Sequence, residues 1–321
     1  MTAEMGSVAA KPKSDQREID RLLEPIVVNR ASRGSRWPLR VVLLNARGGV
    51  RLNRIAQCLT RDPLNRASII LLCESDWRTD RTGGLETAAE LAALLNMSFA
   101  YGPEFAIRGT GGEIDAFLGN AILSAEPFEN VRAVAMPSVE RRTRGYAHKL
   151  RSGRPAGLIT RAKFGGDTIT IGVAHPSSRS SPAGRERQMA TYLAEFPPDG
   201  PAVFGGDLNT TTTELKNLRA IALTALHIAV NPARYRSPQS YEPLFERIAE
   251  RGLEIQGANV MDCPTFTFSR LVPTRMRPKL DWLATRGVKP VAGSAAVVPA
   301  RASLFSPRAS DHDFVLVDIE R

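Results

Sequence analysis

The sequence predicts a mixed α/β domain, and two observations support this prediction. Short apolar runs of strand length alternate with segments of helical periodicity from residue 37 onward. Several neighbouring strand runs are joined by connections too short to hold the crossover helix that parallel strands require. Antiparallel pairs are therefore expected beside parallel ones. Residues 37–321 are expected to form one domain, because they contain no linker and no repeat.

The first half of this domain consists of apolar runs separated by turns. Runs rich in Val, Ile and Leu are typical of buried strands, whereas apolar residues three and four positions apart are typical of helices. The segment GLETAAELAALLN has the clearest amphipathic pattern. In chain order, the prediction is a strand at 39–45, a helix at 54–59, a strand at 68–74, a helix at 84–96, and strands at 98–105 and 118–124.

The second half follows the same two patterns. The run PAVFGGD is apolar up to two glycines and then ends in an acid, as expected for a buried strand that delivers a polar side chain. In chain order, the prediction is strands at 157–164 and 167–176, a helix at 185–196, a strand at 201–207, helices at 213–226 and 241–252, and strands at 279–285 and 312–320.

Residues 1–36 differ from the rest and are expected to form an N-terminal extension that is partly disordered or helical. The first fifteen residues are small and polar and offer little apolar surface to bury. The stretch QREIDRLLEPIVVN places Ile19, Leu22 and Leu23 on one side of a helix that Pro25 would end.

The composition fits a globular protein with an anionic partner. The chain has 321 residues, 43% of them hydrophobic, and a formal net charge of +10. This charge favours nucleic acid, phospholipid surfaces or phosphorylated small molecules, although a generally basic proteome would produce it too. The three cysteines form no C-x-x-C pair, which disfavours a zinc site. Sparse cysteines, no secretory leader and no membrane-length apolar run predict a cytoplasmic protein without a membrane span, and we expect a monomer.

Polar side chains follow or precede the apolar runs at one strand end after another. Strands of one sheet end along a shared edge, so such residues can converge on one cleft. Taken singly, each has a structural explanation: a turn, a helix cap, a core histidine, an Asx-turn or an ion pair. Together they favour a functional site. These residues are Asn45, Glu74, His175, Asp207, Asn209, Asp281, Asp311 and His312.

Several common motifs are absent from the sequence. The stretch DLNTTTTELKNL is not a calcium loop, because Thr212 stands where glycine is needed and Leu218 where glutamate is needed. No G-x-S-x-G elbow and no P-loop motif occurs. The glycine cluster RGTGGE at 108–113 is interpreted as a flexible loop.

In their order and spacing, these residues and the motifs GNAILS, GGDLN, KLDW and SDH resemble the endonuclease/exonuclease/phosphatase superfamily of DNase I-like proteins. The resemblance covers roughly residues 39–320. It implies a four-layer α/β/β/α sandwich of two mixed sheets with helices outside. It also implies cleavage of a phosphoester with a divalent metal, usually Mg²⁺, with Mn²⁺ as the alternative. Two departures, Leu44 in place of a tryptophan and Cys73 in place of a glutamine, concern packing.

The resemblance also implies roles for the residues at the strand ends. Glu74, Asn45 and Asp311 match the metal-binding positions, and oxygen ligands of this kind suit a hard cation. Asp207 and Asn209 match the pair that handles the attacking water and the phosphoryl oxygens. His312 matches a histidine that contacts the phosphate or acts as base, and Asp281 the acid that orients it. His175 matches a general acid.

The resemblance leaves the substrate open. Residues 141–163 carry eight Lys or Arg and no acid, which would attract a long polyanion or form a solvated basic loop. Tyr146 is a candidate for stacking on a base, and Arg154 for reaching the scissile phosphate. The first hypothesis is a phosphodiesterase or nuclease. The alternatives are a hydrolase of phospholipids or small phosphomonoesters, and an inactive binding module on the same fold.

Overall fold

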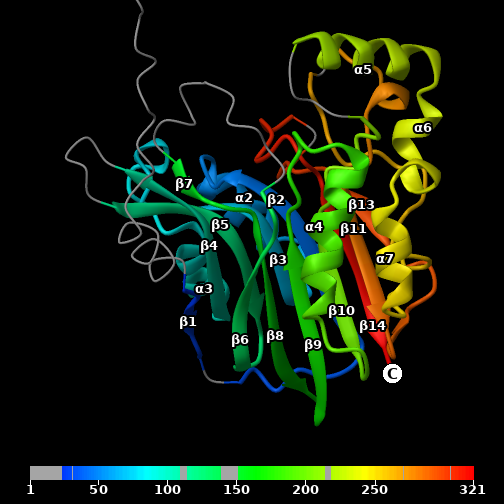
Figure 1. The fold of residues 1–321 in the computed structure, drawn as a ribbon. Coiled ribbons are helices and arrows are strands. Elements are labelled where there is room, and N and C mark those ends of the chain that lie inside the picture. The colour runs from blue at the N-terminus through cyan, green and yellow to red at the C-terminus, as the bar shows by residue number, and fades with distance from the viewer. Residues whose placement is uncertain are drawn as a thin grey trace, which may run out of the picture.

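The computed structural model describes residues 24–30, 32–108, 114–138, 151–213, 218–269, 271–303 and 305–321. Within these ranges two β-sheets pack face to face, and helices cover their outer faces (Figure 1). The predicted four-layer α/β/β/α sandwich of two mixed sheets is therefore confirmed. None of the described helices is long and apolar enough to cross a membrane.

The first sheet is antiparallel except for the pair formed by β2 and β3. Because those two strands are parallel, their carboxyl ends lie at the same edge. In spatial order the strands are β1 (Ile26–Val28), β4 (Ser98–Arg108), β5 (Ile114–Ser124), β3 (Ala67–Trp77), β2 (Leu39–Gly48), β14 (Phe314–Glu320) and β12 (Lys289–Pro290), with β7 (Arg151–Gly153) beside β4 and β13 (Ala296–Val298) beside β14.

The second sheet also contains one parallel pair, β9 and β10. Asp207 ends β10 and lies opposite Asp281, which begins the antiparallel neighbour β11. The register thus brings two of the predicted site residues together. In spatial order the strands are β11 (Asp281–Arg286), β10 (Ala202–Asp207), β9 (Asp167–Ala174), β8 (Ala156–Phe164) and β6 (Phe128–Ala135).

The core lies in three layers that follow from the alternation of side chains along each strand. In β2, Val41 and Leu43 face the second sheet, whereas Val42 and Leu44 face the helices outside. Helices α2 (Leu52–Leu59) and α3 (Thr87–Leu95) cover the first sheet. Helices α4 (Pro182–Ala194) and α7 (Leu244–Glu250) cover the second. Helix α5 (Leu218–Val230) and the short α6 (Ala233–Arg236) lie at the end of the sandwich shown uppermost in Figure 1.

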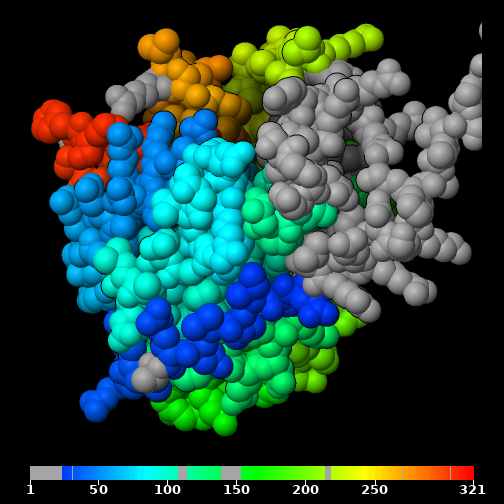
Figure 2. Space-filling view, turned by 90° about the vertical axis from the view of Figure 1, so that its left-hand side faces the viewer, coloured from blue at the N-terminus to red at the C-terminus, as the bar shows by residue number. Residues whose placement is uncertain are grey.

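Part of the predicted N-terminal extension belongs to the folded sheet. The branched residues of β1 pair with β4, and no helix occurs among the described residues before position 37. The side chain of Asn29 both donates to and accepts from the backbone of Phe128, at 3.1 and 2.8 Å. Figure 2 shows this segment in blue, packed across the surface of the molecule. Most of the predicted helix at 16–25 lies outside the described residues.

Other differences from the predicted elements have local causes. Strand β6 was missed because its exposed face carries Glu129 and Arg132, which weakens the apolar signal of this edge strand. Helix α5 is described over Leu218–Val230, and residues 214–217 lie outside the described residues. Thr213 is not helical, since its hydroxyl donates to the backbone oxygen of Thr211. Helix α7 spans Leu244–Glu250 rather than 241–252, because a short 3-10 turn at Pro238–Tyr241 precedes it. The short elements β7, β12, β13 and α6 were not predicted either.

Candidate functional site

The predicted residues come together where the ends of the two sheets meet. The side-chain amide of Asn45, on β2, donates to Glu74 Oε1 on β3 at 3.1 Å and to Asp207 Oδ2 on β10 at 2.9 Å. Asn45 is 1% exposed and Asp207 2%. This amide therefore bridges the first sheet to the second in the interior of the site.

Glycines let β10 approach its neighbours closely. A Cβ added to Gly206 would lie 1.8 Å from the carbonyl oxygen of Ala174 on β9. One residue further along each strand stand Asp207 and His175. The absence of a side chain at Gly206 thus sets the spacing at which these two candidate site residues face each other.

Asp207 lies at the centre of the site. Its Oδ2 atom is 3.7 Å from His175 Nε2 and 3.6 Å from His312 Nε2. Its Oδ1 atom accepts a hydrogen bond of 3.0 Å from the backbone of Asn209. The Asx-turn is therefore present, and the second carboxylate oxygen still faces both imidazoles.

The backbone at Asn209 is not extended. Its φ is 50°, in the left-handed region that asparagine tolerates better than most residues. Its Nδ2 atom donates to the carbonyl oxygen of Pro176 at 2.9 Å. The side chain thus fixes the loop after His175, and its other amide hydrogen is the one available to a substrate oxygen.

His312 and Asp281 form a buried pair. His312 Nδ1 lies 2.8 Å from Asp281 Oδ2, and the two residues are 5% and 0% exposed. The ring of Phe266 packs against His312 at a centroid distance of 4.7 Å. Burial lowers the pKa of His312, but the carboxylates of Asp281 and Asp207 outweigh it and raise the pKa to about 10. His312 is therefore held as a cation at neutral pH.

Glu104 also lies in the candidate site, and it was not predicted from the sequence. It is 2% exposed, accepts a 3.0 Å hydrogen bond from the backbone of Ala156, and lies close enough to His175 for the two to interact electrostatically. Burial raises the pKa of Glu104 to about 7. Burial lowers the pKa of His175, yet Asp207, Glu104 and Glu74 together raise it above its ordinary value. The signal in the sequence was one acid within the predicted strand 98–105.

Asp311 is held next to Asn45 by a hydrogen bond of its neighbour Ser310 and by an ion pair with Arg47. Ser310 Oγ donates to the backbone oxygen of Asn45 at 2.7 Å, and Arg47 Nε lies 3.4 Å from Asp311 Oδ2. Glu74 and Asp311 therefore both flank Asn45, although 237 positions separate them in the chain. Arg47 and Ser310 were not predicted as site residues.

The donor set fits a hard divalent cation. Glu74 and Asp311 keep 32% and 28% of their side chains exposed, so carboxylate oxygens remain available beside the buried Asp207. The amide oxygen of Asn45 accepts the Arg47 N–H at 2.9 Å, and its nitrogen faces the carboxylates. This orientation differs from the predicted one, in which the oxygen serves as ligand.

A second arrangement among the described residues also has metal-like spacing. Asp207, Asp281 and His312 each offer a ligand atom within 4.8 Å of the others. Asp281 and His312 are already hydrogen-bonded to each other, however. We therefore interpret this trio as an acid–imidazole pair that faces Asp207.

The predicted substrate-binding residues are placed only in part. Arg154 is exposed, and its backbone N–H donates to the carbonyl oxygen of Glu104 at 2.9 Å, next to the site. Tyr146 and residues 141–150 of the basic run lie outside the described residues. Cys73, one of the two departures from the superfamily pattern, is buried and accepts the backbone N–H of Asp207 at 3.3 Å.

Comparisons with known proteins agree with the architecture. No protein-family model and no curated protein matches the sequence. Solved structures do match. An endonuclease/exonuclease/phosphatase from Beutenbergia cavernae DSM 12333 is similar with a TM-score of 0.57 and 19% identity, over 89% of this chain and 72% of that one. An endonuclease/exonuclease/phosphatase family protein from Leptotrichia buccalis C-1013-b has a TM-score of 0.57 and 14% identity, over 88% of this chain and 100% of that one.

A third similar structure is a complex with DNA. D. rerio TDP2, complexed with a single-strand DNA product, has a TM-score of 0.54 and 13% identity, over 89% of this chain and 100% of that one. At these identities the likeness concerns the fold. The chain therefore has the fold of the endonuclease/exonuclease/phosphatase, DNase I-like proteins.

Proposed function

We propose that this chain is a divalent-metal-dependent phosphoesterase that acts on phosphodiesters. The observation that supports this most directly is the set of groups around Asp207 Oδ2. The Asn45 amide lies 2.9 Å from this oxygen, and two imidazoles lie within 3.7 Å of it. One carboxylate oxygen, one amide and two histidines at a shared edge can position water and neutralise charge on a phosphoryl group.

The geometry suggests a division of labour among the side chains. Because His312 is held as a cation by Asp281, it suits contact with a phosphoryl oxygen, whose charge grows during attack. Asp207 then remains as the acceptor that orients the attacking water and takes its proton. His175, whose pKa is raised by the surrounding acids, suits proton donation to the leaving oxygen.

Glu74 and Asp311 would hold the metal, and Asn45 would position Glu74 through its side-chain amide. A divalent cation bound there would supply Lewis-acid polarisation of a phosphoryl oxygen. The carboxylates keep their own geometry through protein contacts, since Asn45 holds Glu74 and Arg47 holds Asp311. Mg²⁺ fits an oxygen donor set of this kind, and Mn²⁺ would be tolerated by it.

Nucleic acid is the substrate class we favour. The net charge of +10 attracts polyanions, and one protein of the same fold, D. rerio TDP2, is described in complex with a single-strand DNA product. A second candidate, a phospholipid, is supported by exposed apolar side chains on the loops around Asp281 and His312. Phe268, Leu271 and Phe305 are 56%, 93% and 93% exposed there.

The test is hydrolysis of a panel of phosphoesters with Mg²⁺ or with EDTA. Plasmid DNA, single-stranded RNA, bis-p-nitrophenyl phosphate and sphingomyelin vesicles separate the substrate classes. Cleavage should require the metal and should be lost in Glu74→Gln and in His312→Ala. Glu90→Gln, on the exposed face of α3, serves as the matched control. Full activity in both site variants would reject the proposed centre, and a salt-insensitive, vesicle-specific activity would replace nucleic acid by phospholipid.

A further inference from the structure

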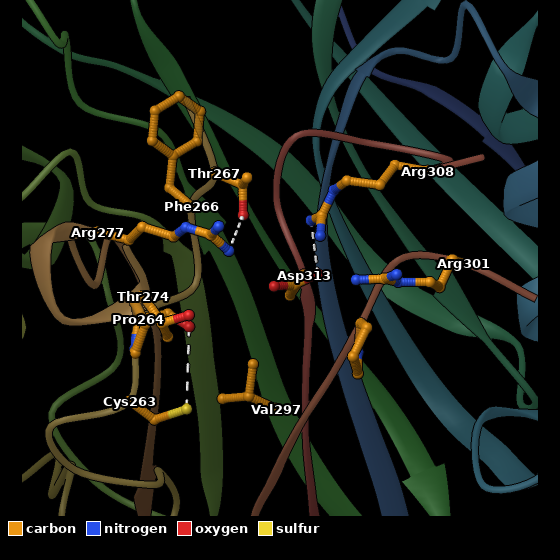
Figure 3. Close-up of a pocket in the computed structure, with 11 residues that line it drawn as sticks. Cys263, Pro264, Phe266, Thr267, Thr274, Arg277, Val297, Arg301, Arg308 and Asp313 are labelled. Carbon is orange, nitrogen blue, oxygen red and sulfur yellow. Dashed lines mark hydrogen bonds and ion pairs between the residues drawn. The ribbon is translucent and has the colours of Figure 1, made fainter. Parts of the chain in front are cut away.

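A separate cavity adjoins the candidate centre on the C-terminal loops. It has a volume of about 210 Å³ and lies between residues 263–277 on one side and 297–313 on the other (Figure 3). Phe266 lines it and also packs against the ring of His312. Asp313 lines it as well, one residue beyond that histidine. The cavity thus lies next to the proposed reaction centre and is lined by none of its polar side chains, although Arg308 donates to the backbone oxygens of Ser310 and Asp311 at 2.8 and 3.4 Å.

Positive charge dominates the wall of this cavity. Arg277, Arg301 and Arg308 all line it, and Figure 3 shows their guanidinium groups directed toward its interior from two sides. The carboxylate in the wall is that of Asp313, which pairs with Arg308 at 2.6 Å. Arg277 donates to two uncharged oxygens, Val272 O at 3.0 Å and Thr267 Oγ1 at 3.4 Å. Its charge is therefore not matched by these contacts.

An anion would relieve this arrangement. Guanidinium groups that face one half-enclosed space repel one another, and the repulsion grows where water is restricted. Their planar forks match the oxygens of a phosphate group. The cavity has room for several water molecules and hence for a tetrahedral oxyanion, and the hydroxyl of Thr267 adds a neutral donor to its wall.

We infer that this cavity is a binding site for a phosphate group, with Arg277, Arg301 and Arg308 as its recognition elements. The ligand is a phosphate group of a substrate, or inorganic phosphate. The first source rests on the proposed function, because the contact between Phe266 and His312 places the cavity where a second phosphate of the substrate can lie. The affinity for phosphate does not depend on hydrolysis.

The test is titration calorimetry with inorganic phosphate in the presence of EDTA, so that no metal contributes. Arg277→Gln should weaken binding at least about tenfold, since it removes a charge-assisted contact. Arg275→Gln, which changes an exposed arginine two positions away, should bind as the wild type does. His312→Ala, which removes the anion contact proposed at the reaction centre, should leave phosphate binding that still depends on Arg277.

A second variant is expected to raise the affinity of the cavity for phosphate. Asp313→Asn removes the negative charge from the wall and keeps an oxygen for the backbone N–H of Ala300, so phosphate should bind more tightly. This gain keeps the test valid if Arg277→Gln fails to fold. Phosphate binding that is unchanged by both substitutions, or that is lost in His312→Ala, would overturn the inference.

Kinetics then identify the source of the phosphate group. If the substrate supplies it, Arg277→Gln raises KM for a 5′-phosphorylated oligonucleotide but not for the same oligonucleotide without that phosphate. If the ligand is free phosphate, the two KM values change equally, and inhibition by added inorganic phosphate is lost. Either result agrees with a phosphate site in the cavity.

Discussion

Asn45 and Asp207 lie on different sheets, and a hydrogen bond of 2.9 Å joins their side chains. The same amide also donates to Glu74 at 3.1 Å. Two carboxylates are thus held side by side by one shared donor. This contact couples the packing of the sandwich to the geometry of the candidate site.

Replacement of Asn45 by Ala should therefore damage both stability and activity. Asp207 would lose a buried donor, which is expected to cost about 1–3 kcal/mol in the free energy of unfolding. Loss of alignment between the carboxylates is expected to lower kcat by about a hundredfold or more. Urea denaturation and steady-state kinetics measure the two effects. Asn65→Ala, at an exposed position, is the control, and a wild-type kcat in Asn45→Ala would contradict the bridging role.

Glu104→Gln should remove the negative charge beside His175 and keep the hydrogen bond that Glu104 accepts. The amide can still accept the backbone N–H of Ala156, but it cannot hold a proton on the imidazole. We expect kcat to fall about tenfold to a hundredfold. Since burial raises the pKa of Glu104 to about 7, its ionised form is costly above that pH, and the variant should be at least as stable as the wild type at pH 8. Glu126→Gln, a buried acid bonded to Ser35, should keep full activity.

Lys279 should make stability increase with pH in the alkaline range. Its Nζ has no hydrogen-bond partner among the described residues and lies 4.6 Å from the ring of Trp282. Burial lowers its pKa to about 8. Between that pH and the ordinary pKa of a free lysine, the unfolded chain binds more protons, so the free energy of unfolding rises with pH.

Lys279→Met should remove this rise and stabilise the protein at pH 7 by about 3 kcal/mol. Urea denaturation from pH 7 to 10.5 measures the slope. Lys289→Met, at an exposed position of β12, should retain the wild-type slope. An identical pH slope in Lys279→Met and the wild type would show that the ammonium is not desolvated.

Gly206→Ala should push β10 away from β9. The added Cβ would clash with the carbonyl oxygen of Ala174, a backbone atom that no side-chain rotation can move. We expect destabilisation of about 1–3 kcal/mol and a lower kcat, because His175 and Asp207 follow directly on the two strands. Thermal unfolding and kinetics test this. A wild-type melting temperature would mean that the strands separate without cost.

The sequence was sufficient for the candidate residues that end apolar runs, although β2 and β3 continue three residues beyond Asn45 and Glu74. Asn45, Glu74, Asp207 and Asp281 each adjoin an apolar run, and the parallel pairs β2–β3 and β9–β10 bring those runs to one edge. Glu104 escaped notice because it lies within a strand, and burial beside His175 depends on tertiary packing. The positive φ of Asn209 was not predicted for a similar reason, because it accompanies a tertiary hydrogen bond from the Asn209 side chain to Pro176.

The position of strand β14 makes the protein sensitive to a single proteolytic cut. It lies between β2 and β12, and the short segment before it carries Asp311 and His312. Proteolytic removal of this segment and strand would take away two residues of the candidate site in one cut. It would also leave the apolar strand β2 as a bare sheet edge, which is a template for aggregation. Loss of the last dozen residues should thus make the chain both inactive and insoluble.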